Sequence, residues 1–275
     1  MAHVWEFLAG IAAGVFAGLT GAGGGLLLVP VLVLFGLPPI SAIATSNLAI
    51  VVTASSGTVT NAIRFGLNWR RVAELAVPAV ILAPLGVWLA GALPATALLL
   101  AFAAFNLVNI PLIGRRPGGS AAVDLSPDVA SSPAADLSPD SASPPESEPS
   151  RTMAEELPRA VATGAGAGVL AGLFGVGGGL IMVPMQVLLL STPVRIASRI
   201  SLAVVVFASA SAVITHSFSS GVVHWVTGLV IAAGGLLGAP LGASLLHRMS
   251  DRAATRMFQV TMACVAGIFV WKALG

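Results

Sequence analysis

This sequence has few charged residues. Asp, Glu, Lys and Arg make up only 9% of its 275 residues, whereas a soluble domain carries about 25%. Cysteine is also scarce: a single Cys264 excludes an intrachain disulfide framework and a cysteine metal cluster, and we expect it to pack in an apolar helix. The start lacks the basic region of a cleavable signal peptide, so we expect its apolar run to persist.

Most of the sequence consists of long apolar runs with almost no charged residues. They cover residues 4–36, 40–63, 72–93, 94–113, 158–190, 197–218, 225–247 and 253–274. Most reach the roughly 20 residues that a helix needs to cross a bilayer, and the alternation typical of transmembrane strands is absent. We therefore predict an all-α polytopic protein of the inner (plasma) membrane, surrounded by lipid and without a nucleic-acid partner.

A glycine cassette occurs twice. Residues 18–30 read GLTGAGGGLLLVP and residues 172–184 read GLFGVGGGLIMVP, with nine of thirteen positions identical at an offset of 154. The chain is therefore expected to contain two copies of one unit. Paired glycine-interrupted segments in the two halves of a membrane protein indicate a binding site at the repeat interface.

Residues 117–157 change character and separate the two copies. They are rich in Pro, Ser, Ala and Asp, and eight of the eleven acidic residues lie between Asp124 and Glu156. Such a segment cannot bury enough apolar surface to fold, so we predict a disordered linker. The domain division is then a first membrane repeat at 1–116, the linker at 117–157 and a second membrane repeat at 158–275.

The basic residues indicate the topology. Arginines gather in the loop 64–71, at both flanks of the linker and in the loop 247–256, whereas the loops near 91–95 and 219–224 contain none. By the positive-inside rule the arginine-bearing regions are cytoplasmic. The linker is then cytoplasmic and both termini are external. On this path residues 158–190 start and finish on the same side of the membrane, and residues 4–36 do the same from the outer side.

Each glycine-rich run is therefore expected to be a re-entrant hairpin or a pair of half-helices that do not span. A straight helix of 33 residues would measure about 50 Å, against a hydrocarbon core of about 30 Å. Each half then holds one glycine-broken hairpin and three transmembrane helices. An odd number of crossings makes the halves inverted repeats.

The backbone breaks predicted at the two glycine clusters favour the binding of an anion. Irregular backbone at membrane depth has to line a cavity or be buried in protein, and the N-terminus of the half-helix after each break attracts negative charge. Polar residues at the start of the following helix offer further hydrogen-bond donors. The candidate substrate-binding residues are Gly21, Gly23, Gly24, Gly25, Thr45, Ser46, Asn47, Gly175, Gly177, Gly178, Gly179, Ser198, Arg199 and Ser201.

Other interpretations stay open at several of these positions. Single Ser and Thr residues often bond to their own backbone, Arg199 can extend to the cytoplasmic interface, and His216 either carries a proton or sits at the membrane interface. Glu74 is expected to pair with Arg70 and Arg71. The spaced glycines suit close helix packing and leave room for a homodimer; they are Gly10, Gly14, Gly18, Gly164, Gly168, Gly172, Gly234, Gly238 and Gly242.

The doubled cassette, the polar runs at 45–49 (TSNLA) and 199–203 (RISLA), and the turns at 66–69 and 221–225 resemble the TauE/SafE (sulfite exporter, TSUP) transporter family. The resemblance covers both membrane halves and implies secondary transport of sulfite, an organosulfonate or a related sulfur or carboxylate anion. It implies a site formed by the two glycine clusters and the polar runs near Asn47 and Ser201. Where a second Thr-Ser pair would match, this chain has Arg199 and Ile200.

The sequence leaves three functions open, two of which involve transport. We favour a secondary transporter of a small anion, working as an exporter by alternating access, with H⁺ as the expected driving ion. The alternative is a passive anion channel with the same selectivity elements. A membrane scaffold is a third option. No histidine has metal-ligand spacing and no nucleophile–base pair stands out, so we expect no enzyme activity, no metal and no cofactor.

Overall fold

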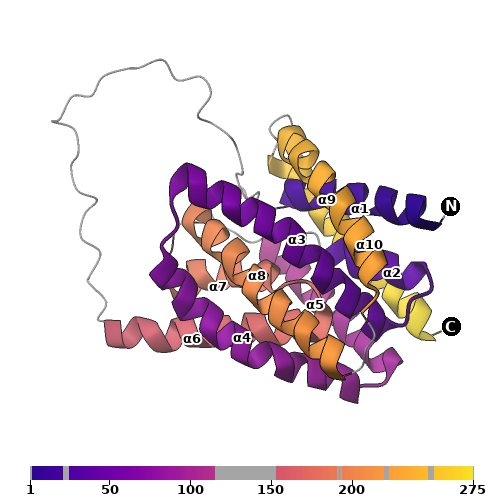
Figure 1. Cartoon of the computed structure of the whole chain (residues 1–275), viewed down its shortest axis with the longest axis horizontal. Helices are drawn as coiled ribbons and strands as arrows, with labels where there is room; N and C mark the ends of the chain where they lie inside the picture. Colours follow the sequence, from indigo (N-terminus) through magenta and orange to yellow (C-terminus); the bar gives the residue numbers. More distant parts are fainter. Residues whose placement is uncertain are drawn as a thin grey trace.

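The computed structural model describes residues 2–20, 25–114, 153–190, 192, 194–219, 223–246 and 251–274, and these are helical apart from short turns (Figure 1). The helices are α1 (Ala2–Thr20), α2 (Gly25–Leu34), α3 (Pro39–Phe65), α4 (Trp69–Ala92), α5 (Ala95–Gly114), α6 (Met153–Phe174), α7 (Gly179–Leu189), α8 (Val194–Ser219), α9 (Trp225–Leu246) and α10 (Asp251–Leu274). The prediction of an all-α protein is confirmed. The expected linker lies outside the described residues, except that residues 153–157 begin α6.

Familiar local signals set several helix ends. Pro39 occupies the first turn of α3, where its missing N–H has no partner to lose, and Gly66 ends that helix with a φ of +70°. Asn68 caps α4, because its side-chain oxygen accepts a hydrogen bond from the backbone N–H of Arg71 at 3.3 Å. These signals bring the chain out of α3 and directly into α4.

Four of the described helical stretches are long and apolar enough to cross a membrane: Pro39–Ile63, Trp69–Ala92, Leu157–Phe174 and Ile196–Ser219. The protein is thus a multi-pass membrane protein. The sequence predicts a re-entrant hairpin or two half-helices that do not span the membrane. The structure differs for α6, which alone contains a stretch of spanning length, whereas α7 has only 11 residues. The glycine break therefore divides the second run unequally.

Helix α1 packs along α9. A Cβ added to Gly10 would lie 2.9 Å from the Cα of Ile231, and one added to Gly14 would lie 2.7 Å from the Cα of Gly235. Only glycine allows this approach. Both contacts advance along the two helices in the same direction, so α1 and α9 are parallel.

Helix α6 packs along α4 in the same way. A Cβ on Gly164 would lie 3.0 Å from the carbonyl carbon of Leu75, and one on Gly168 would lie 2.7 Å from the Cα of Ala79. Close packing of the spaced glycines is therefore confirmed at these positions. These small faces are used for contacts inside the chain, and the homodimer stays a prediction.

Helices α3 and α8 lie together at the centre of the molecule (Figure 1). Helix α3 also contacts α2 and α9, and α8 also contacts α4 and α7. On another side α5 packs on α10, where Phe102 and Phe269 meet edge to face at 4.8 Å. Cys264 of α10 is exposed, so the expectation that it packs inside the chain is wrong.

Candidate functional site

The second glycine cassette breaks the helix between α6 and α7. Gly175, Gly177 and Gly178 have φ values of +65°, +75° and +70°, a region in which residues with a Cβ are strained. All three are buried. Gly172 packs against Ala83, the fifteenth of the 24 residues of α4, so the break lies within the depth of α4 and not at its end.

The first cassette reaches the same place through the start of α2. Gly21, Gly23 and Gly24 lie outside the described residues. A Cβ on Gly25 would lie 2.8 Å from the Cα of Val176 and 2.9 Å from the carbonyl oxygen of Gly175. The first turn of α2 therefore rests against the backbone of the second break.

Two residues of the polar run in α3 hold the end of α6. The Ser46 hydroxyl donates to the carbonyl of Gly175 at 2.8 Å, with the Ile43 carbonyl 3.0 Å away as a second acceptor. The Asn47 amide nitrogen donates to the carbonyl of Ala171 at 3.2 Å. Both side chains are fully buried. Ser46 thus pairs with the Gly175 carbonyl just past the end of α6, and Asn47 adds a second bond to the Ala171 carbonyl, which also accepts from the backbone N–H of Gly175 at 3.0 Å.

The third member of that run faces elsewhere. The Thr45 hydroxyl accepts a hydrogen bond from the backbone N–H of His224 at 3.2 Å. Thr45 is thus attached to the segment that leads into α9, away from the break. The polar run predicted as one site is split by the helical turn, and only Ser46 and Asn47 lie at the glycines.

The polar run of the second half contacts α7 and not the break. Gln186 donates from its amide nitrogen to the Ser201 hydroxyl at 2.9 Å, and both side chains are buried. Gln186 lies seven residues after Gly179, about 10 Å along α7. Ser198 is buried and Arg199 is half-buried on the same helix. The structure places Ser201 beyond the break, toward the far end of α7, and Ser198 and Arg199 precede it on α8.

Two polar residues of α8 that were not among the candidates lie beside the cassette. The Ser209 hydroxyl is fully buried, has no hydrogen-bond partner and is 3.5 Å from the position of a Cβ on Gly177. His216 is buried in the protein and hydrogen-bonds to the backbone of Gly172, while its depth in the membrane stays a prediction. Sequence reasoning placed the site at the start of α8, whereas Ser209 lies eight residues after Ser201, at the level where α8 meets Gly177.

Apolar and polar side chains meet at the centre of the site. Side chains of Ile50 and Val205 approach Gly177, with Ser209 next to them. Ile50 lies three residues after Asn47 on the same face of α3. The Asn47 side-chain oxygen, like the Ser209 hydroxyl, is buried without a partner. A buried polar atom without a partner costs about 1–3 kcal/mol, and a bound ligand would recover that cost. Among the described residues, no group of His, Cys, Asp and Glu side chains could hold a metal.

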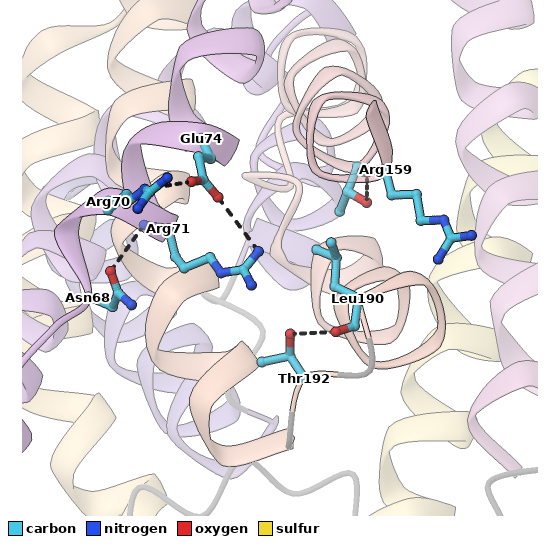
Figure 2. Close-up of polar contacts among 8 residues, drawn as sticks. Asn68, Arg70, Arg71, Glu74, Arg159, Leu190 and Thr192 are labelled. Atoms are coloured by element: carbon cyan, nitrogen blue, oxygen red, sulfur yellow. Dashed lines mark hydrogen bonds and ion pairs between the residues drawn. The ribbon is translucent and has the colours of Figure 1, made fainter. Parts of the chain in front are cut away.

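A charged cluster lies at the end of the molecule where α4 and α6 begin and α7 ends (Figure 2). Glu74 is 3.3 Å from Arg70 and 3.6 Å from Arg71, which confirms the predicted pairing. Figure 2 shows Arg71 and Arg159 coming from opposite sides of the α7 end, where the Thr192 hydroxyl donates to the Leu190 carbonyl at 3.4 Å.

The model of the family described as "Sulfite exporter TauE/SafE" matches residues 6–269. The chain belongs to this family. It is therefore a member of a family of membrane transporters. Over 107 residues the transporter is 28% identical to the "Probable membrane transporter protein YunE" of Bacillus subtilis (strain 168). That match spans 39% of each chain. No solved structure matches the transporter.

Proposed function

We propose that this transporter carries a small anion, namely sulfite, an organosulfonate or a related sulfur or carboxylate anion, and works as an exporter. The observation that carries the proposal is the Ser209 hydroxyl, a buried donor without a partner beside the break between α6 and α7. The first turn of α2 adjoins the same backbone.

The chemistry of the break favours negative charge. Gly178 precedes α7 and has no side chain to accept from its first turn. The Ile181 N–H already donates to the Gly178 carbonyl at 3.2 Å, so the N–H groups of Gly179 and Leu180 are the donors that we assign to an anion. The positive ends of the α2 and α7 dipoles add to this preference. The atoms nearest to a Cβ built on Gly175, Gly177 or Gly178 belong to uncharged residues, among them Ser46 and Ser209. Backbone dipoles and hydroxyls therefore supply the binding, which keeps release easy.

We propose that the two membrane halves, 1–116 and 158–275, are inverted repeats joined by the 117–157 linker. Gly10 and Gly14 face α9, while their counterparts Gly164 and Gly168, 154 residues later, face α4. The partners correspond too, because Leu75 and Ala79 precede Ile231 and Gly235 by 156 residues. The glycine-bearing first helix of each half thus packs at equivalent positions on a helix of the other half.

The positions of the helix ends support a cytoplasmic linker and external termini. The start of α1 and the end of α10 lie at one end of the molecule, and the start of α6 lies at the other (Figure 1). At the first end Lys272 donates to the Val33 carbonyl at 2.5 Å, and the Thr227 hydroxyl donates to Glu6 at 3.1 Å. The arginine cluster of Figure 2 marks the opposite, cytoplasmic end.

Alternating access would act through the contacts that join the halves at the break. Ser46 and Asn47 of the first half bind carbonyls of the second half. Movement of α3 against the end of α6 would break these bonds and open the anion site to the other side. A passive channel would need no such exchange, since it conducts without a bound-state cycle.

Binding and exchange test the proposal. Purified transporter is heated with sulfite, sulfate, thiosulfate, sulfoacetate, taurine or acetate. A specific anion should raise the midpoint of unfolding saturably, with a stabilisation of about 2.7 kcal/mol at 100 times its Kd. The same anion should show accelerated counterflow in proteoliposomes. Absence of both effects for every anion would reject the site, and current without counterflow would favour the channel.

A further inference from the structure

One face of α3 continues from the break toward the cytoplasmic end proposed above. Starting at Asn47, it carries Ile50, Ala54, Thr58 and Asn61 at intervals of three or four residues, and all five side chains are buried. Ile50 meets the positions of both Gly25 and Gly177. From Asn47 to Asn61 this face runs about 21 Å. It therefore links the break to the part of the molecule where α3 ends.

The far part of this face holds two polar atoms without partners. They are the Thr58 hydroxyl and the Asn61 amide nitrogen, on side chains that are 9% and 5% exposed. Thr58 and Asn61 are three residues apart, so their side chains are neighbours on the helix. Each could bind the same small ligand.

Other hydroxyls on α3 behave differently. Thr53, Ser55 and Thr60 each donate to the carbonyl four residues earlier, at 3.0, 2.6 and 2.9 Å. This back-bonding is the usual state of such residues in an apolar helix. The Thr58 hydroxyl is buried, yet it makes no such bond. Leaving two buried polar atoms unpaired costs free energy. The simplest explanation is a ligand that binds to both atoms reversibly.

We propose that Thr58 and Asn61 form a second, transient anion subsite on the cytoplasmic side of the break. An amide nitrogen only donates, and a hydroxyl can donate, so the pair fits an oxyanion and not a metal cation. The subsite rests on the proposed function, because it serves an anion that travels between the break and the cytoplasm. It lies about 16–21 Å from Asn47 along α3, which makes it distinct from the central site.

Three substitutions test the subsite. Thr58→Val and Asn61→Leu remove the donors with little change in volume, and we expect each to lower anion flux in proteoliposomes about tenfold. Asn61→Asp keeps the shape but adds negative charge, and we expect a larger loss at pH 8. Thr60→Val is the matched control, because Thr60 is exposed and already bonded to the Ser56 carbonyl. It should keep flux within about twofold of wild type.

A second readout separates the subsite from the central site. The Kd of the anion from thermal shift should stay within about twofold in Thr58→Val and Asn61→Leu, since the break is untouched. Wild-type flux in both variants would overturn the subsite while leaving central binding intact. Undiminished flux in Asn61→Asp would also overturn it, because water or a cation would tolerate the charge. If Asn61→Leu fails to fold, Thr58→Val and Asn61→Ser decide the question by the same criteria.

Discussion

Asn47 and Asn106 show how the same residue serves two purposes in an apolar helix. Both side chains are fully buried and both leave the side-chain oxygen without a partner. Asn106 donates to Phe102 of its own helix at 2.8 Å, whereas Asn47 donates across to Ala171 of α6. Only Asn47 therefore joins a second helix to the break.

Replacing each asparagine by leucine should separate these purposes. Leucine matches asparagine closely in size but cannot donate a hydrogen bond. We expect Asn47→Leu to lower anion flux at least tenfold, because the end of α6 loses its tie to α3 and the site loses a polar atom. Asn106→Leu should keep flux within about twofold. Flux assays on both reconstituted variants make the comparison, and equal losses would remove Asn47 from the site.

At the scale of single helices, the sequence predicts two uses of glycine, and both occur along α6 and the break that follows it. The spaced Gly164 and Gly168 pack on α4, while Gly175, Gly177 and Gly178 adopt positive φ in the break. Their partners could not be predicted. A small-residue face requires a close neighbour, but it does not say which helix that neighbour is. The same limit applies to Ser46, whose acceptor at Gly175 is 129 residues away.

Two alanine substitutions on α6 should show which glycines pack. A Cβ at Gly168 would enter the backbone of Ala79, whereas one at Gly166 meets nothing within 4 Å. We expect Gly168→Ala to destabilise the transporter by about 1–3 kcal/mol, the usual cost of overpacking. Gly166→Ala should leave the melting temperature unchanged or raised. Thermal unfolding of both variants in detergent measures the difference, and equal melting temperatures would mean that α4 and α6 are not held this closely.

At the scale of the whole molecule, hydropathy predicts the helices well but not their arrangement. Each apolar run appears as helix, and the two glycine-rich runs appear as helix pairs. Apolar content alone does not specify that α1 lies on α9 or that α3 lies on α8, because every such face satisfies lipid equally well. Contacts between glycine backbones, such as Gly14 with Gly235, decide the arrangement.

Labelling of single cysteines should test the topology. In a Cys264→Ala background, His3→Cys and Ala92→Cys should react with an impermeant maleimide in intact cells, because the N-terminus and the turn after α4 are proposed to be external. Ser131→Cys, in the linker, should react only after the membrane is opened. Labelling of Ser131→Cys in intact cells, or protection of His3→Cys, would contradict the inverted arrangement.

The pairing of α1 with α9 also orders the events of biosynthesis. More than 200 residues separate the end of α1 from the start of α9, which takes a ribosome roughly 10–40 s to translate at about 5–20 residues per second. During that interval the glycine face of α1 has only lipid or an insertase to lie against. Helix α6, by contrast, emerges when its partner α4 is already in the bilayer. The N-terminal helix is thus among the first to be made and the last to be locked into place.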